Sequence, residues 1–385
     1  MSLRSVVKGI LRYELSGPMP LVHFGFWGET LRKWAEQGHI EMSDAREAGD
    51  ASAAETRIGQ KLGFDLNYHS VFNFSGALRP GFPGSVIEEL PDGSRKVLNG
   101  DGVVVLEKPG AGSIPMEFDH LLKDRESWET HFRHRLQFSP ERYQDAGVMV
   151  DDRWLAFDKG GRDYLAGDKR EHLYGLFCGS LLGQIRSWLG VEGMCYLQAD
   201  DPDLFSEIVA TNADVWYETT KGVLESGAKF DFAHFWEDIC YKSGPLVSPR
   251  VFREVVGPHY RRITALVVGY GLDIVSLDCD GRIDALVPIW LENGVNTMFP
   301  IEVGTWGASI RPWREQYGRQ VRGVGGMNKT VFARDRAAVD AEIERLRPLV
   351  ALGGYIPCPD HRIAPDAEWD NVAYYCERMR KVFGD

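Results

Sequence analysis

The chain of 385 residues has an ordinary globular composition, with 44% hydrophobic residues, 26% charged residues and no biased tract. Its formal net charge of -12 argues against nucleic acid or an anionic membrane as a partner. No apolar run reaches the roughly 18 residues of a membrane-spanning helix. The first apolar run is too short for a secretory signal, and the six cysteines form no CxxC pair, so we expect a cytoplasmic protein with free thiols.

Eight short apolar stretches, each ending in polar residues or glycine, are predicted to be strands. They are 20–27, 69–76, 172–179, 230–238, 273–281, 296–304, 321–329 and 353–361. Helical periodicity separates the later ones, over 248–271, 284–294 and 334–354. Strands that alternate with helices indicate parallel βαβ units, and eight units predict one α/β domain over residues 1–385, a (β/α)8 TIM barrel. Neither GxGxxG after the first strand nor a P-loop motif is present.

Residues 79–118 interrupt this rhythm. They combine strand-like alternation with Pro-Asp-Gly and Gly-Asp-Gly, which are hairpin signals. We interpret the segment as a β-hairpin inserted after the second barrel strand, serving as a lid or as a contact in a homodimer.

Polar and aromatic side chains recur at the carboxyl ends of the predicted strands, where functional groups of such barrels collect. They are Trp27, Glu29, Asn73, Glu237, Asp238, Asp278, Asp280, Glu302, Asn328, Lys329 and His361. A purely structural barrel gains nothing from clustered acids, so this convergence predicts a site.

The stretch "SLDCDG", residues 276–281, admits two interpretations. Asp and Gly are common in turns, so the two acids could form a solvated turn. Alternatively, Asp278, Asp280 and His361 could hold a metal ion with open positions, because carboxylates and imidazole suit Zn, Mn or Fe(II). Without a metal, repulsion between the acids would raise one pKa and create a general acid.

Other residues carry their own alternatives. Glu237 is a candidate general acid or base, or it caps the following segment. Cys279 alternates with its neighbours along the strand and is expected in the core, whereas Cys358 is a weaker ligand candidate. The remaining histidines are expected to be structural or at the surface: His23, His39, His69, His120, His131, His134, His172, His234 and His259.

Three blocks in this order resemble the uroporphyrinogen decarboxylase superfamily. They are "FWEDICYKSGPLVSPRVFREVVGPHYRRI", "GVGGMNK" and "GGYIPCPDHRIAPDAEWDN". The resemblance covers about residue 15 to the C-terminus, more weakly over 79–118, and implies a (β/α)8 barrel. The superfamily also contains cobalamin-linked methyltransferases for methanol, methylamines, coenzyme M and aromatic methyl ethers.

The methyltransferase branch carries zinc on His-x-Cys-Gly and a later Cys. The resemblance places these positions on Asp278, Asp280, Gly281 and His361. Each ligand position therefore holds a residue that can bind metal, although none is the residue of the family. Harder Asp, Asp and His ligands replace soft thiolates, which departs from zinc-thiolate chemistry.

The decarboxylase branch implies a different set. Its Ser and His match Ser248 and His361, but the arginine pair of its N-terminal loop is missing after the first strand. Asn73 stands where that branch has an acid. A porphyrinogen with its many carboxylates needs the positive cradle, so true uroporphyrinogen decarboxylation is not expected.

The sequence thus predicts a metal-dependent methyltransferase-like enzyme for a small substrate, methylated aromatic compounds included. Asp278, Asp280 and His361 would bind the ion, and a separate corrinoid protein would be the partner. The residues predicted to contact substrate are Trp27, Asn73, Trp236, Ser248, Glu302 and Lys329. A metal-free decarboxylase or other lyase and a non-catalytic binding barrel are the alternatives.

Overall fold

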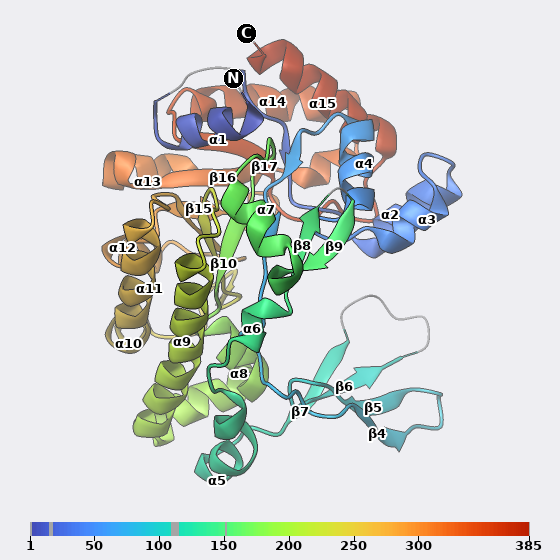
Figure 1. Cartoon of the computed structure of the whole chain (residues 1–385). Coiled ribbons are helices and arrows are strands. Elements are labelled where there is room, and N and C mark those ends of the chain that lie inside the picture. The colour runs from blue at the N-terminus through green and yellow to red at the C-terminus, as the bar shows by residue number, and fades with distance from the viewer. Residues whose placement is uncertain (1, 15–17, 109–114, 151, 385) are drawn as a thin grey trace.

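The computed structural model describes residues 2–14, 18–108, 115–150 and 152–384 as an α/β fold (Figure 1). Its strands are β1 (Val22–His23), β2 (Leu66–Asn67), β3 (Val71–Phe72), β4 (Ser85–Glu89), β5 (Arg95–Leu98), β6 (Val103–Glu107), β7 (Met116–His120), β8 (Gly147–Val150), β9 (Arg153–Ala156), β10 (Gly175–Gly179), β11 (Ala233–Trp236), β12 (Cys240–Tyr241), β13 (Gly244–Pro245), β14 (Val275–Asp278), β15 (Thr297–Phe299), β16 (Arg322–Met327) and β17 (Tyr355–Pro359). Each of the eight predicted stretches contains one of these strands.

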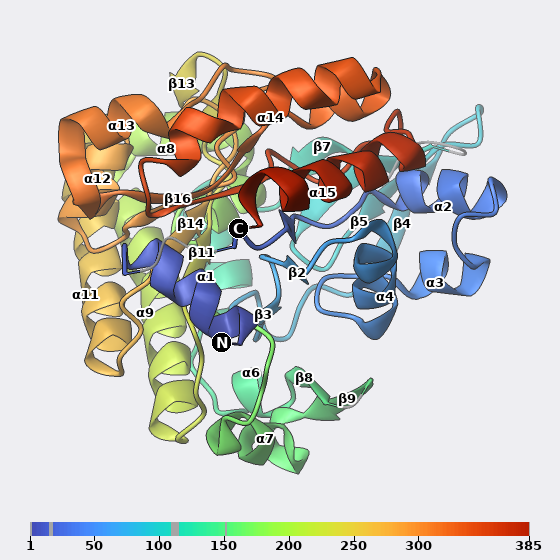
Figure 2. The ribbon, with the colours of Figure 1, turned by 90° about the horizontal axis from the view of Figure 1, so that it is seen from above.

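The helices lie outside the central sheet (Figure 2). They are α1 (Leu3–Leu11), α2 (Gly28–Glu36), α3 (Met42–Glu47), α4 (Ala53–Leu62), α5 (Arg125–Ser127), α6 (Glu141–Gln144), α7 (Gly161–Gly167), α8 (Gly183–Asp200), α9 (Pro202–Glu225), α10 (Pro249–Val251), α11 (Gly257–Gly269), α12 (Val287–Glu292), α13 (Ile310–Tyr317), α14 (Arg336–Val350) and α15 (Trp369–Phe383). Short turns of other helix types are η1 (Trp128–Phe132), η2 (Arg133–Arg135), η3 (Phe157–Lys159), η4 (Phe252–Val256), η5 (Gly318–Gln320) and η6 (Lys329–Ala333). Within the described residues no helix is long and apolar enough to cross a membrane.

The central sheet is parallel, with strand order β17-β16-β15-β14-β11-β10-β3. β1 pairs in parallel with β2, and an isolated parallel bridge joins Phe26, just after β1, to Ile363, just after β17. Within the described residues, hydrogen bonding therefore does not run through all eight strands as one closed barrel. The parallel order still brings the carboxyl ends of the strands to one edge.

One cluster of buried apolar side chains lies among the parallel strands and includes residues of α1. The cluster comprises Val7, Ile10, Leu11, Met19, Val22, Phe24, Tyr68, Leu173, Phe232, Ile274, Phe299, Val324, Ile356 and Cys358. The cluster thus joins apolar residues of α1 to residues in or beside eight segments of parallel strand. A larger cluster lies between the strands and the outer helices.

Strands β4, β5, β6 and β7 form a four-stranded antiparallel sheet that lies apart from the parallel sheet (Figure 1). The segment thus contains four antiparallel strands where a single hairpin was predicted. Residues 91–93 and 99–102 connect its first three strands, as the turn signals indicate. The sequence pattern gave no indication of the second hairpin, β8-β9.

The helix predicted over 248–271 is divided into α10, the π-helical turn η4 and α11. Pro258 explains the break, because it has no N–H to donate to the carbonyl of Glu254. Ser248 occupies the N-cap position of α10, but its side chain makes no capping bond.

Candidate functional site

The site lies at the carboxyl ends of β11 and β14 to β17, in the position that the parallel order predicts. Asp278 is the last residue of β14, paired with Trp236 of β11 and Phe299 of β15. Asp280 follows two residues later, and His361 lies two residues beyond the end of β17.

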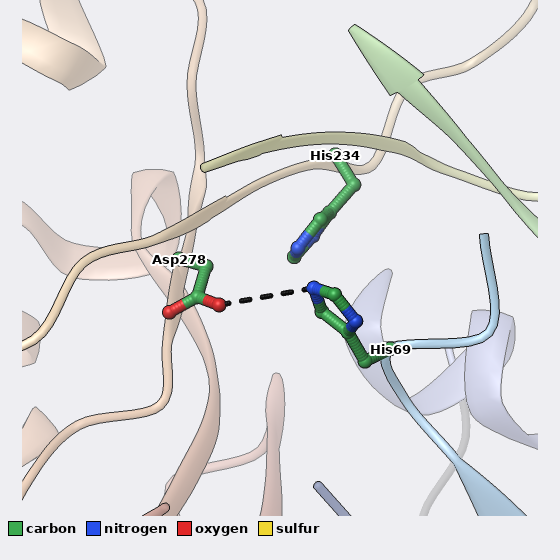
Figure 3. Close-up of side chains that lie close together, drawn as sticks. All are labelled: His69, His234 and Asp278. Atoms are coloured by element: carbon green, nitrogen blue, oxygen red, sulfur yellow. Dashed lines mark ion pairs between the residues drawn. The ribbon is translucent and has the colours of Figure 1, made fainter. Parts of the chain in front are cut away.

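Asp278 faces two histidines rather than a second acid (Figure 3). One ligand atom each from His69, His234 and Asp278 lies within 4.8 Å of the other two. His69 Nε2 is 3.9 Å from Asp278 Oδ2, and the two imidazole rings are nearly perpendicular, with centroids 5.3 Å apart. Asp278 is 4% exposed and His234 is fully buried. Burial first, and the neighbouring Asp280 second, raise the pKa of Asp278 well above its usual range.

His69 is fixed by Asp50, which lies between α3 and α4. His69 Nδ1 is 3.1 Å from Asp50 Oδ2, and Arg362 donates to both oxygens of the same carboxylate. Asn67 donates to Asp50 Oδ1 at 3.1 Å and accepts the backbone N–H of His69 at 2.8 Å. Although burial opposes it, the bonds from His69 and Arg362 lower the pKa of Asp50, so this carboxylate is charged.

A second pair lies beside this cluster. His361 Nε2 is 3.1 Å from Asp280 Oδ2, and Trp27 stacks on the His361 ring with centroids 5.6 Å apart and planes 14° apart. Asp280 Oδ1 and His361 Nδ1 are buried and have no protein hydrogen-bond partner. The side chains of both residues are otherwise partly accessible, at 33% and 18%. A carboxylate–imidazole pair of this kind, reached by solvent and flanked by an indole face, can exchange protons with a small ligand.

The structure changes the predicted ligand set. Among the described residues, the three-ligand group comprises His69, His234 and Asp278, whereas Asp280 and His361 bind each other. Asp278 thus lies with two histidines, while the other two predicted ligands, Asp280 and His361, form a pair beside it. Strand alternation would place Asp280 on the same face as Asp278, but β14 ends at Asp278 and the chain turns at Gly281 (φ +81°), so the alternation no longer applies to Asp280.

Glu237 is also placed differently from the prediction. Its carboxylate accepts the backbone N–H groups of Leu181, Leu182 and Gly183 at the start of α8, and the hydroxyls of Ser180 and Tyr260. It has no exposed surface. Burial raises the pKa of Glu237, and the bonds from Tyr260, Gly183, Leu181 and Leu182 oppose that rise by stabilising the charged form. Glu237 thus anchors α8, which precedes it in the chain, rather than capping the segment that follows, and it is not exposed to a substrate.

Glu302 and Lys329 border the Asp280–His361 pair. Glu302 accepts the Gly281 N–H at 2.7 Å and the indole N–H of Trp306. Burial lowers the pKa of Lys329, and the negative charges of Asp360, Glu302 and Asp280 oppose that change. The bonds to Glu302 fix the turn that carries Asp280.

The other predicted contact residues are dispersed. Trp236 is half-buried beside Asp278 in the register of β11 and β14. Asn73 and Ser248 are exposed, after β3 and at the start of α10 respectively. Cys279 and Cys358 are buried, and burial raises the pKa of both thiols, so neither has the thiolate character of a ready metal ligand.

His69, His234, Asp50 and Arg362 were not predicted as site residues. His234 lies within β11, where its register partner is Ser276 and the partner of Trp236 is Asp278. The alternation that places Asp278 inward therefore places His234 inward as well, and this signal was available in the sequence. Asp50 lies outside any predicted strand, so no spacing could have found it.

Comparison with known proteins identifies the family. The model of the uroporphyrinogen decarboxylase (URO-D) family matches residues 184–382, more than half of the chain. A methyltransferase from Methanosarcina mazei has a similar fold, with a TM-score of 0.60, 12% identity and coverage of 100% of this chain and 99% of that chain. A B12-independent methionine synthase from Shewanella sp. W3-18-1 aligns with a TM-score of 0.38, 13% identity and coverage of 56% and 64%. No curated protein sequence matches. The chain belongs to the uroporphyrinogen decarboxylase family.

Proposed function

We propose that the protein is a metal-dependent, methyltransferase-like enzyme that removes a methyl group from a small substrate, methoxyaromatic compounds included, and passes it to a corrinoid protein. The observation that carries the proposal is the Asp280–His361 pair under Trp27, beside the His69–His234–Asp278 cluster, at the carboxyl edge of the sheet. The fold likeness to a methyltransferase over the whole chain supports the same branch.

The proposal includes the architecture. We infer that the eight parallel strands form one (β/α)8 barrel, with residues 79–118 inserted after its second strand as a lid or a dimer contact. The interior cluster supports this, because its side chains come from segments all around the sheet and from α1. The bridge from Phe26 to Ile363 supports it as well, because it joins the segments after the first and last predicted strands.

Each residue then has a role. A divalent ion would supply Lewis acidity toward the heteroatom that carries the methyl group. The carbon–heteroatom bond breaks, the methyl group leaves for the acceptor without the bonding electrons, and His361, which contacts Asp280, donates a proton to the heteroatom. Trp27 offers its face to an aromatic substrate, while Glu302 and Lys329 hold the polar border.

The test uses the full-length protein with free cob(I)alamin as methyl acceptor. Candidate donors are an aliphatic alcohol, methylamines, a methyl thioether and a methoxyaromatic acid. We expect formation of methylcobalamin, followed by its absorbance, together with the demethylated product by mass spectrometry. Both should require the protein and stop on chelation.

A metal-free decarboxylase is the second candidate, because the Asp280–His361 pair could transfer a proton to a carbanion without an ion. A decarboxylase would release CO2 from a carboxylic acid, and this activity would survive chelation of metal ions. If the protein neither transfers a methyl group from the candidate donors nor releases CO2 from carboxylic acids, the non-catalytic binding barrel remains.

A further inference from the structure

We propose that His69, His234 and Asp278 bind one divalent transition-metal ion, with Asp50 as the residue that orients His69. The inference deepens the proposed function by naming the ligands of its metal. It can be tested without any substrate, so metal binding and methyl transfer can fail independently.

The distances favour one ion shared by the three side chains. Two ligands of a tetrahedral zinc ion at about 2.0–2.1 Å each are separated by about 3.3 Å. The three ligand atoms here lie within 4.8 Å of one another, and His69 Nε2 is 3.9 Å from Asp278 Oδ2. Small side-chain rotations would therefore complete the site, and the fourth position would remain free for a substrate heteroatom.

His234 supplies the independent sign of a ligand. The side chain is fully buried, and neither of its ring nitrogens has a hydrogen-bond partner in the protein. Aromatic rings surround it, with Phe232 and Phe299 at centroid distances of 6.0 and 5.9 Å. An unpaired polar atom in such surroundings is costly, and an ion bound to one nitrogen would remove that cost. Burial lowers the pKa of His234, so the imidazole is neutral, as a metal ligand must be.

Asp50 gives His69 the orientation that a ligand needs. The Nδ1–H donates to Asp50 Oδ2, so the lone pair of Nε2 points toward Asp278. A carboxylate behind a ligating histidine is the common arrangement of zinc sites, and it fixes both the tautomer and the ring. Arg362 and Asn67 hold Asp50 in turn.

The backbone at Gly25 makes room for this support. A Cβ atom there would stand 2.6 Å from Arg362 Nη1 and 3.2 Å from Asp50 Oδ1, and its φ of +81° also favours glycine. The glycine thus permits the contact between Arg362 and Asp50 on which the orientation of His69 depends.

The donor set also limits the metal. Two imidazole nitrogens and one carboxylate oxygen suit Zn, Fe(II) or Mn, whereas Mg and Ca prefer oxygen ligands only. Neither buried thiol, Cys279 or Cys358, belongs to the group.

The test measures Zn²⁺ binding by protein purified without a histidine tag and stripped by chelation. Wild type should bind about one ion per chain, measured by mass spectrometry and by competition with a chromophoric chelator. His69→Gln, His234→Gln and Asp278→Asn should each lose stoichiometric binding. His39→Gln, a half-buried histidine stacked on Trp369, is the matched control and should bind as wild type.

Asp50→Asn should retain about one site per chain but bind Zn²⁺ about 10- to 100-fold more weakly, with a changed visible spectrum after Co²⁺ substitution. An effect on apo-protein unfolding alone, with Zn²⁺ affinity unchanged, would overturn the positioning role. His69→Gln replaces a half-buried loop residue, so it keeps the ligand test valid if His234→Gln misfolds. Retained binding in His69→Gln, or its loss in His361→Gln alone, would overturn the ligand set.

Discussion

Tyr260 of α11 donates its hydroxyl hydrogen to Glu237 Oε1 at 2.5 Å, joining a helix of the outer layer to the end of β11. The same carboxylate accepts three backbone N–H groups at the start of α8. One side chain therefore connects the end of β11 to α8 and to α11. An acid that the sequence offers as a candidate general acid or base thus has structural contacts.

Glu237→Gln should lower the free energy of unfolding by about 2–4 kcal/mol, because an amide N–H₂ would face donors that now bind an oxygen. Denaturant unfolding measures this. Asp238→Asn should cost less than about 1 kcal/mol, because the Asp238 side chain, paired with Arg186, is 40% exposed. Unchanged stability together with lost turnover would instead return Glu237 to acid–base catalysis.

Asp280→Asn and His361→Gln should each reduce the turnover number by about 10²- to 10⁴-fold, the usual contribution of a general acid. Zn²⁺ stoichiometry should remain at the wild-type value, because neither residue is a proposed ligand. Steady-state methyl transfer to free cobalamin provides the rate, with Asp284→Asn as a nearby control that should react normally. Equal activity of all three variants would exclude the pair from the chemistry.

Glu55 should make stability depend on pH. Burial first, and Asp50 second, raise the pKa of Glu55 from 4.5 to about 8. The folded state then holds a proton that the unfolded state releases, so this contribution to stability is present below pH 4.5 and lost as pH rises through 8. The loss should be on the order of 5 kcal/mol, given about 1.4 kcal/mol per pKa unit.

Unfolding of wild type and Glu55→Gln at several pH values tests this. The difference in free energy of unfolding between them should change in favour of the glutamine variant as pH increases. A difference that stays constant from pH 5 to about 9 would show that Glu55 has an ordinary pKa.

Asp231 ties the opposite end of the sheet together. Its side chain is fully buried and contacts Arg4 and Lys8 of α1 and the buried Arg170. Asp231→Asn should cost about 3 kcal/mol, because it removes the buried carboxylate beside Arg170 and leaves that side chain only the partly exposed Asp168, while Zn²⁺ binding is unaffected. Asp163→Asn, in an exposed pair with Arg162, should change stability by less than about 0.5 kcal/mol. If folded Asp231→Asn lost Zn²⁺ binding, the expectation that the Asp231 cluster and the proposed metal site are independent would be contradicted.

The sequence predicted the parallel strands and the edge where the site lies, because period and turn residues are local signals. It also brought Asp280 and His361 to that edge. It could not predict that Asp50, from a helix connection, supports His69, since such a contact depends on tertiary packing. Glu237 shows the same limit, because the sequence pattern of an acid after a strand is the same whether the side chain faces solvent or the start of a helix.

The N-terminal segment is bound by residues near the other end of the chain. Tyr13 donates to the carbonyl of Val321 at 2.5 Å, Thr30 to that of Ile363 at 2.8 Å and the Trp34 indole to that of Ala367 at 3.2 Å. During synthesis, residues 13–34 therefore cannot complete these contacts until residues 321–367 have emerged. Such non-local contacts slow folding and leave apolar surface exposed on the growing chain. The apolar face of α1 is thus the surface on which a chaperone should act until β17 has left the ribosome.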